Sequence, residues 1–184
     1  MGGAAALAVL GGAASAATVS FEGLADLSNV GTISGITFTN AQARVPVNLT
    51  GVDGTTAIRF TGSAVQGTTN IIGAAFSSAV SSVSIRAIDV GAAGAVLRAY
   101  NAANVLVGTA TATGLTQAGI GEWFPLSVAG AGIVRIELAQ LGGLAGAENG
   151  DGILWDLLQT QEAVVPVPAA ALLFPAGIAA LGAM

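Results

Sequence analysis

The chain has 184 residues, which is enough to bury the core of one ordinary domain. Only 8% of its residues are charged, the formal net charge is −5, and the few basic residues are scattered arginines, which excludes the clustered cations of a nucleic-acid-binding protein. The sequence has no His, Cys or Lys, which excludes Ser-His-Asp relays, thiol nucleophiles, Schiff bases and disulfides.

Residues 1–17 are predicted to be a signal peptide. An apolar run up to Leu10 is followed by small residues whose spacing fits cleavage before Ala17 or Thr18. No Lys or Arg precedes Leu10, although signal peptides usually carry one there. A plain Ala- and Gly-rich leader, or a start further upstream, is therefore the alternative.

From Thr18 onward, short β-branched runs separated by Gly and Asn predict strands. The expected strands cover residues 18–22, 35–39, 57–61, 71–76, 83–89, 95–100, 105–113, 123–128, 133–138 and 153–158. In the fifth of these, Val83, Ile85 and Ala87 should face one side of a sheet, and the residues between them the other. The clearest hairpin joins residues 96–100 to 105–109, since Asn residues in its turn tolerate left-handed backbone angles.

Many short strands with no amphipathic helix between them predict an all-β fold. We expect an antiparallel β-sandwich (jelly roll) over residues 18–161, with the apolar leader and a C-terminal hydrophobic helix outside it. A parallel α/β sheet would need crossover helices, and no connection has their length or period.

Residues 162–184 differ in composition from the rest and are predicted to be a sorting tail. The linker Val165, Pro166, Val167 and Pro168 should be extended and stiff, because each Pro fixes its own φ and restricts the residue before it. Residues 169–184 carry no charge. As a helix they would be about 24 Å long, shorter than the bilayer core of about 30 Å. The tail is thus expected to be a temporary anchor.

This tail resembles the PEP-CTERM sorting region of Gram-negative exported proteins. Residues 165–170 occupy the position of the Pro-containing motif, with Val167 where an acidic residue is usual, and residues 171–184 occupy the hydrophobic position. The arginines that usually close such a tail do not appear before Met184. The resemblance implies export, transient inner-membrane anchoring, and processing by an exosortase.

The middle of the chain resembles the jelly-roll, carbohydrate-binding-module-like domain that such proteins often carry. The resemblance lies in residues 21–24, 96–102, 107–110, 123–128, 133–137 and 152–158. In that family a calcium ion commonly ties the first strand to the last, and Glu22 and Asp156 occupy matching positions, which implies a structural calcium site with oxygen ligands. The alternative is that Glu22 pairs with an arginine and Asp156 is a solvated turn residue.

Three aromatic residues are large and polar enough to stack on a sugar: Trp123, Trp155 and Tyr100. Each also lies in a strand pattern, so packing in the core is the alternative role. Catalysis by carboxylates would need two of them flanking a cleft, and the acidic residues show no such signature. No catalytic residue is therefore assigned.

The expected function is that of a non-enzymatic protein at the cell surface or in the extracellular matrix, sorted by its tail through the export machinery and an exosortase. The alternative is a polysaccharide-binding module with exopolysaccharide as its partner. A carboxylate-based glycoside hydrolase is the remote alternative.

Overall fold

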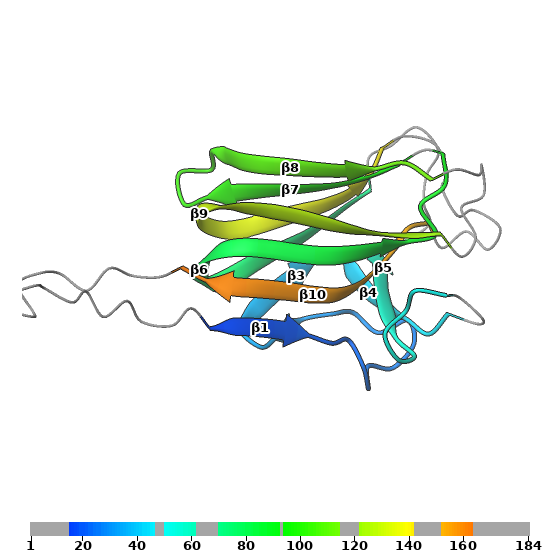
Figure 1. The fold of residues 1–184 in the computed structure, drawn as a ribbon. Coiled ribbons are helices and arrows are strands. Elements are labelled where there is room, and N and C mark those ends of the chain that lie inside the picture. The colour runs from blue at the N-terminus through cyan, green and yellow to red at the C-terminus, as the bar shows by residue number, and fades with distance from the viewer. Residues whose placement is uncertain are drawn as a thin grey trace, which may run out of the picture. The chain divides into compact units, whose positions relative to one another are not determined.

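The computed structural model describes residues 15–46, 50–61, 70–92, 94–114, 122–141 and 152–163. All of them except Ser15 belong to one compact unit, Ala16–Ala163. Ten antiparallel strands are found in these residues (Figure 1): β1 (Ala16–Val19), β2 (Thr32–Ile33), β3 (Ile36–Thr39), β4 (Ala41–Arg44), β5 (Ala57–Phe60), β6 (Ile71–Ile88), β7 (Ala95–Asn101), β8 (Leu106–Ala112), β9 (Trp123–Gln140) and β10 (Leu154–Glu162). No helix with the length and apolarity of a membrane span occurs in the described residues.

The predicted signal peptide and sorting tail lie at the two ends of the chain. Residues 1–14 and the sorting motif at 165–168 lie outside the described residues, so the signal peptide and the tail stay predictions. β1 begins at Ala16 and pairs with β10, so the predicted cleavage before Thr18 would remove the first two residues of this strand.

β6 and β9 are each 18 residues long and take part in both layers of the fold. Residues 71–75 of β6 pair with 135–139 of β9, and residues 82–88 pair with 123–129. Register shifts between these two ladders mark where the paired strands pass from one layer to the other. The sequence predicts two shorter strands where β6 and where β9 each run as one. The reason is that the bends of these long strands contain small residues that resemble turn residues, among them Gly132 with a φ of 70°.

These pairings give two antiparallel layers (Figure 1). Layer 1 has the order β2-β3-β6-β9-β7-β8 and uses residues 71–75 of β6 and 133–140 of β9. Layer 2 has the order β9-β6-β10-β5-β4 and uses the other halves of β6 and β9. β1 also belongs to layer 2, because it pairs with β10, as β5 does. The predicted all-β antiparallel β-sandwich is confirmed. β2 and β4 are not predicted from the sequence, and they are only two and four residues long.

The layers enclose a core of aliphatic side chains that alternate with outward residues, as in any half-buried strand. Val83, Ile85 and Ala87 are at most 1% exposed, as predicted, while the residues between them are half-buried on the outer side. A Cβ at Gly108 on β8 would lie 2.7 Å from Val128 on β9. Only glycine therefore lets β8 approach the first half of β9 this closely.

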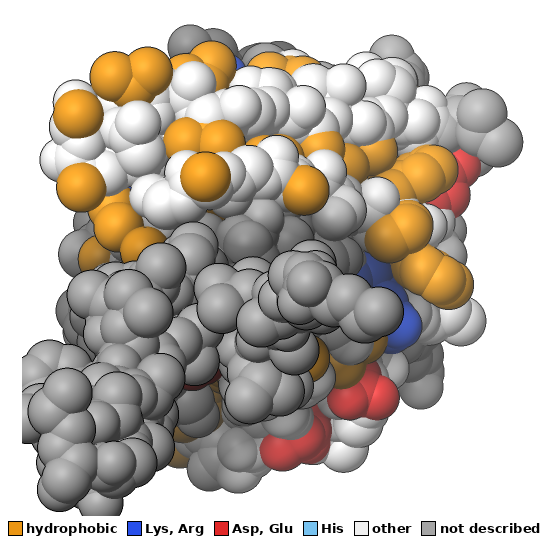
Figure 2. Space-filling model, turned by 60° about the vertical axis from the view of Figure 1, so that its left-hand side comes forward, with side chains coloured by type: hydrophobic (Ala, Val, Ile, Leu, Met, Phe, Trp, Pro, Cys, Tyr) orange, Lys and Arg blue, Asp and Glu red, His pale blue; other side chains and the backbone are white. Residues whose placement is uncertain are grey.

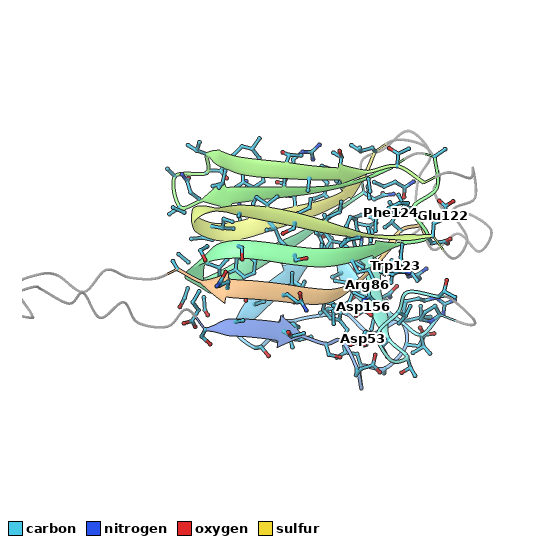
Figure 3. The ribbon with its side chains drawn as sticks, in the orientation of Figure 1. Asp53, Arg86, Glu122, Trp123, Phe124 and Asp156 are labelled. Atoms are coloured by element: carbon cyan, nitrogen blue, oxygen red, sulfur yellow. The ribbon has the colours of Figure 1, made fainter. Side chains whose placement is uncertain are left out.

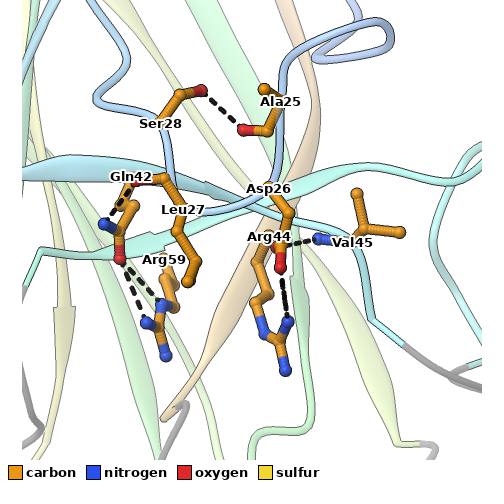
Figure 4. Close-up of polar contacts among 8 residues, drawn as sticks. All are labelled: Ala25, Asp26, Leu27, Ser28, Gln42, Arg44, Val45 and Arg59. Atoms are coloured by element: carbon orange, nitrogen blue, oxygen red, sulfur yellow. Dashed lines mark hydrogen bonds and ion pairs between the residues drawn. The ribbon is translucent and has the colours of Figure 1, made fainter.

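The segment after β1 closes the β4 edge of layer 2 (Figure 4). The Leu27 N–H donates to Ala43 O at 2.9 Å, and the Ala43 N–H donates to Ser28 O at 2.8 Å. The Asp26 carboxylate forms an ion pair with Arg44 at 3.1 Å, which holds this segment in place. Because an open edge strand is a template for unwanted pairing, the segment protects the sandwich on this side.

Candidate functional site

Charged side chains are sparse on this molecule. In the view of Figure 2 most of the described surface is white or orange, and blue and red occupy small separate areas. In a chain with 8% charged residues, a face where several charges meet is unusual. The described residues contain two places where charged side chains meet an exposed or half-buried aromatic ring.

The outer face of layer 1 presents two adjacent rows of side chains. Successive ladder partners on β3, β6, β9, β7 and β8 form the first row: Thr39, Gly73, Glu137, Arg98 and Thr109. Partners on the first four of these strands form the second row: Thr37, Ala75, Arg135 and Tyr100. Facing partners in antiparallel strands have Cβ atoms about 5 Å apart, so the members of each row are close neighbours. The two rows are two residues apart along each strand and lie side by side on one face.

Small residues on β6 leave a hollow of about 280 Å³ in this face, which we call the layer 1 hollow. Gly73 lies between Thr39 and Glu137, and a Cβ on it would be 2.5 Å from Thr39 Oγ1. Two threonine hydroxyls and the Asn40 amide line one side of the hollow, and Arg135 with Glu137 lines the other. The hollow therefore offers hydrogen-bond donors and acceptors on opposite walls.

Tyr100 and Arg135 fix Glu137 in place. The Tyr100 hydroxyl donates to Glu137 Oε2 at 2.7 Å, and Arg135 Nη1 donates to Glu137 Oε1 at 2.9 Å. The Arg135 guanidinium also lies 3.7 Å from the centroid of the Tyr100 ring, and its Nε donates to Asn104 Oδ1 at 2.9 Å. Each group is held by at least two contacts, so the site is preorganised.

These contacts shift two pKa values away from neutrality. Burial alone would raise the pKa of Glu137, but hydrogen bonds from Tyr100 and Arg135 and the charges of Arg135 and Arg98 hold that pKa below its usual range. Burial, and then the hydrogen bond to Glu137, raises the pKa of Tyr100. At neutral pH Glu137 is therefore ionised and Tyr100 is protonated, and neither is poised to exchange a proton.

Arg98 lies between Glu137 and Thr109 in the first row and is half-buried. Its charge acts on Glu137. Within the described residues, however, its guanidinium makes no hydrogen bond and no ion pair. Its five N–H donors are thus available to a molecule from solution.

The second place lies at one end of layer 2, around Trp123 (Figure 3). Trp123 is 44% exposed, and the Arg86 guanidinium lies 4.6 Å from its ring centroid. Arg86 Nη1 donates to Gly51 O at 2.5 Å. Gly51 has a φ of 96°, and a Cβ on it would lie 2.7 Å from the indole ring. Trp123 thus packs against both Arg86 and the loop before β5.

Glu22 holds the same loop from another direction. Its carboxylate accepts hydrogen bonds from the Thr55 N–H at 3.0 Å, the Thr56 N–H at 2.8 Å and the Thr55 hydroxyl at 2.8 Å. Desolvation would raise the pKa of Glu22, but these three hydrogen bonds together lower it. The sequence-based alternative for Glu22 was pairing with an arginine. In the structure its carboxylate binds Thr55 and Thr56 of this loop.

Asp156 is 1% exposed, so it is a buried residue and not the solvated turn residue of the sequence-based alternative. Its carboxylate accepts from the Asp53 N–H at 2.5 Å and the Leu157 N–H at 2.7 Å. Burial raises the pKa of Asp156, and the charge of Asp53 adds to this effect. Asp156 and Glu22 therefore bind one loop, residues 53–56, through its backbone N–H groups.

The calcium site remains a prediction. The described residues contain no group of three or more His, Cys, Asp or Glu side chains that could hold a metal ion. Glu22 and Asp156 would need backbone carbonyl or water oxygens to complete a calcium shell.

The three predicted stacking residues lie in three separate places. Tyr100 lies on the outer face of layer 1, Trp123 on the outer face of layer 2, and Trp155 in the core at 3% exposure. Burial leaves the Trp155 ring unable to stack on a ligand from solution. No sequence pattern singles out Arg98, Arg135 or the threonines of β3 as functional residues. Their alternation with apolar residues predicts a solvated face but not which strands adjoin.

No protein-family model matches the chain, and no curated protein is significantly similar to it. A family 29 carbohydrate-binding module complexed with mannohexaose aligns with 81% of this chain and 92% of its own, at 14% identity and a TM-score of 0.48. The cleaved adhesin domain of Lys-gingipain aligns with 80% of this chain and 98% of its own, at 12% identity and a TM-score of 0.49. A family 35 carbohydrate-binding module from Paenibacillus barcinonensis aligns with 80% of this chain and 98% of its own, at 18% identity and a TM-score of 0.40. Likeness at this level does not define what this chain binds.

Proposed function

We propose that this chain is a non-enzymatic protein of the cell surface or extracellular matrix, and that its sandwich binds polysaccharide at the layer 1 hollow. The observation that carries the proposal is the pair of cross-strand rows on layer 1. They place threonine hydroxyls, the Asn40 amide and the Arg135–Glu137 ion pair around one depression, with the Tyr100 ring beside it. A sugar ring needs polar groups at its edges and an apolar or aromatic surface at its face.

The size of the hollow favours a chain-like ligand. Its volume of about 280 Å³ is just below the roughly 300–1,000 Å³ typical of pockets that enclose a small molecule. One sugar residue could occupy the hollow while its neighbours continue along the rows toward Thr109 on β8. An open face crossed by five strands suits a polymer better than a small molecule enclosed in a pocket.

The same residues support binding without hydrolysis. A glycosidase needs two carboxyl groups about 5 to 9.5 Å apart, one of them protonated to act as the acid. Among the described residues that line the hollow, Glu137 is the one carboxylate. Its lowered pKa keeps it ionised, which suits a hydrogen-bond acceptor and not an acid catalyst.

We also propose that residues 1–17 export the chain and that the tail at 162–184 is a sorting signal cut by an exosortase at the Val165–Pro168 motif. The support is the resemblance of the tail to PEP-CTERM regions. Cell fractionation tests it: deletion of residues 165–184 should shift the protein from the membrane and surface fractions into the soluble secreted fraction. An unchanged distribution would defeat the sorting proposal.

The binding proposal is tested by screening the full chain against immobilised polysaccharides. The double variant Tyr100→Ala, Glu137→Gln should lose binding by about tenfold or more, because two charge-assisted or stacking contacts contribute at least about 1.4 kcal/mol together. Trp123→Ala, on the opposite layer, is the matched control and should bind like the wild type. Binding that survives the double variant and disappears with Trp123→Ala would place the site on layer 2.

A further inference from the structure

Arg98 has donors that the described part of the molecule does not use. Buried polar groups in folded proteins normally find partners, and Arg98 is half-buried. The neighbour of Arg98 on β9, Glu137, has its Oε1 bound by Arg135 at 2.9 Å and its Oε2 bound by Tyr100 at 2.7 Å. Glu137 is thus bound at both oxygens without Arg98.

The charges on this face do not balance. Arg135 and Glu137 neutralise each other as an ion pair, which leaves the charge of Arg98 in excess. The other members of the two rows are uncharged: Thr37, Thr39, Gly73, Ala75, Tyr100 and Thr109. The whole chain carries −5, so a net positive face is a local exception. An excess cation on a preorganised polar face attracts an anion.

We propose that the polysaccharide bound at the layer 1 hollow is acidic and that a carboxylate on its sugars pairs with Arg98. This inference rests on the proposed function and names the class of ligand. A guanidinium accepts a planar carboxylate through two parallel N–H···O bonds. One surplus charge matches one carboxylate on one sugar residue. The hydroxyl of Thr109, the next residue of the row, adds a donor or acceptor for the same sugar.

The test compares three probes that differ in charge chemistry: polygalacturonate, its fully methyl-esterified form, and dextran sulfate. Affinities are measured with the full chain by titration calorimetry. The wild type should bind polygalacturonate about tenfold more tightly than the ester, as expected for one charge-assisted bidentate contact. Arg98→Gln should remove this preference, because it weakens binding of polygalacturonate more than binding of the ester, while Arg98→Lys should keep part of the preference.

Two controls separate the charge of Arg98 from other effects. Arg44→Gln removes the same charge at the β4 edge of layer 2 and should keep the wild-type preference. Thermal unfolding of Arg98→Gln should stay close to that of the wild type, since the variant loses the attraction between Arg98 and Glu137 but no described intramolecular hydrogen bond. Raising the salt concentration should weaken the binding of polygalacturonate more than that of the ester.

Several outcomes would overturn the inference. Equal affinity for the acid and the ester, unaltered by Arg98→Gln, would refute it while sustaining the proposed function. If the protein binds only dextran sulfate, and Arg98→Gln loses this binding, then the group that pairs with Arg98 is a sulfate ester and not a carboxylate. Binding of none of the three probes would refute the acidic ligand, and the wider polysaccharide screen would then decide the proposed function separately.

Discussion

Gly73 on β6 lies directly opposite Thr39 on β3, so close that a Cβ at position 73 would be 2.5 Å from the Thr39 hydroxyl oxygen. The missing side chain is what makes the layer 1 hollow, because Gly73 is part of its floor. A strand interior normally disfavours glycine, since glycine packs nothing and loses more backbone entropy. Its presence here keeps the space between β3 and β9 open.

Gly73→Ala should therefore weaken polysaccharide binding by about fivefold to tenfold, roughly 1 to 1.4 kcal/mol. Stability should stay within about 1 kcal/mol of the wild type, because alanine gains strand propensity and loses some packing freedom at Thr39. Gly31→Ala is the matched control, since a Cβ at Gly31 would meet nothing within 4 Å. Wild-type affinity in Gly73→Ala would show that the ligand does not enter the hollow.

The two tryptophans should report separately in fluorescence. Trp123 is 44% exposed and Trp155 is 3% exposed, so acrylamide should quench the first and spare the second. Trp123→Phe should leave a blue-shifted spectrum with little quenching, because only the core indole then emits. A quenchable, red-shifted spectrum in Trp123→Phe would contradict the burial of Trp155.

Stability on the acid side should depend on Glu137 and Glu22. Their folded pKa values are lowered from the ordinary 4.5, so the stability they contribute is fully present above about pH 4.5 and is lost as the pH falls through the lowered values. Asp156 has the opposite sign: its raised pKa makes ionisation costly above its ordinary 3.8, and acidification relieves that cost.

Urea unfolding at a series of pH values measures these contributions. Glu137→Gln and Glu22→Gln should each flatten the loss of unfolding free energy in acid. Curves for the two variants that run parallel to the wild type would show that neither carboxylate is stabilised in the folded state.

The predicted calcium ion has its own test. If calcium binds Glu22 and Asp156, then adding it should raise the Tm of the wild type, because a ligand of the folded state stabilises that state by mass action. The variant Glu22→Gln should lose the response, and Asp53→Asn, whose backbone rather than side chain contacts Asp156, should keep most of it. An identical Tm with calcium and with a chelator would dismiss the site.

Local patterns in the sequence predict much of this fold. The alternation around Val83 and Ile85 places both in the core correctly, and the hairpin between residues 96–100 and 105–109 forms as expected, with Asn104 at a φ of 60°. β6 and β9 are predicted as four strands because Ser, Ala and Gly at their bends mimic turns. The bends are instead where strands change layer.

The candidate site could not be predicted in the same way, because pairing between distant strands assembles it. Thr39 and Gly73 are brought together by the β3–β6 ladder, and Glu137 and Arg98 by the β9–β7 ladder. No local pattern shows which strands adjoin. The choice among aromatic residues was equally open, since Trp155 and Trp123 both stand in strands and only the layer arrangement buries the first.

Backbone amide shifts followed by NMR during addition of a bound oligosaccharide test the central claim most directly. We expect the shifts to follow the two rows on layer 1, with the largest changes at Thr39, Gly73, Arg98 and Glu137. Amides around Trp123 and Gly51, on the other layer, should not move. Shifts confined to that second region, or spread evenly over both layers, would contradict binding at the layer 1 hollow.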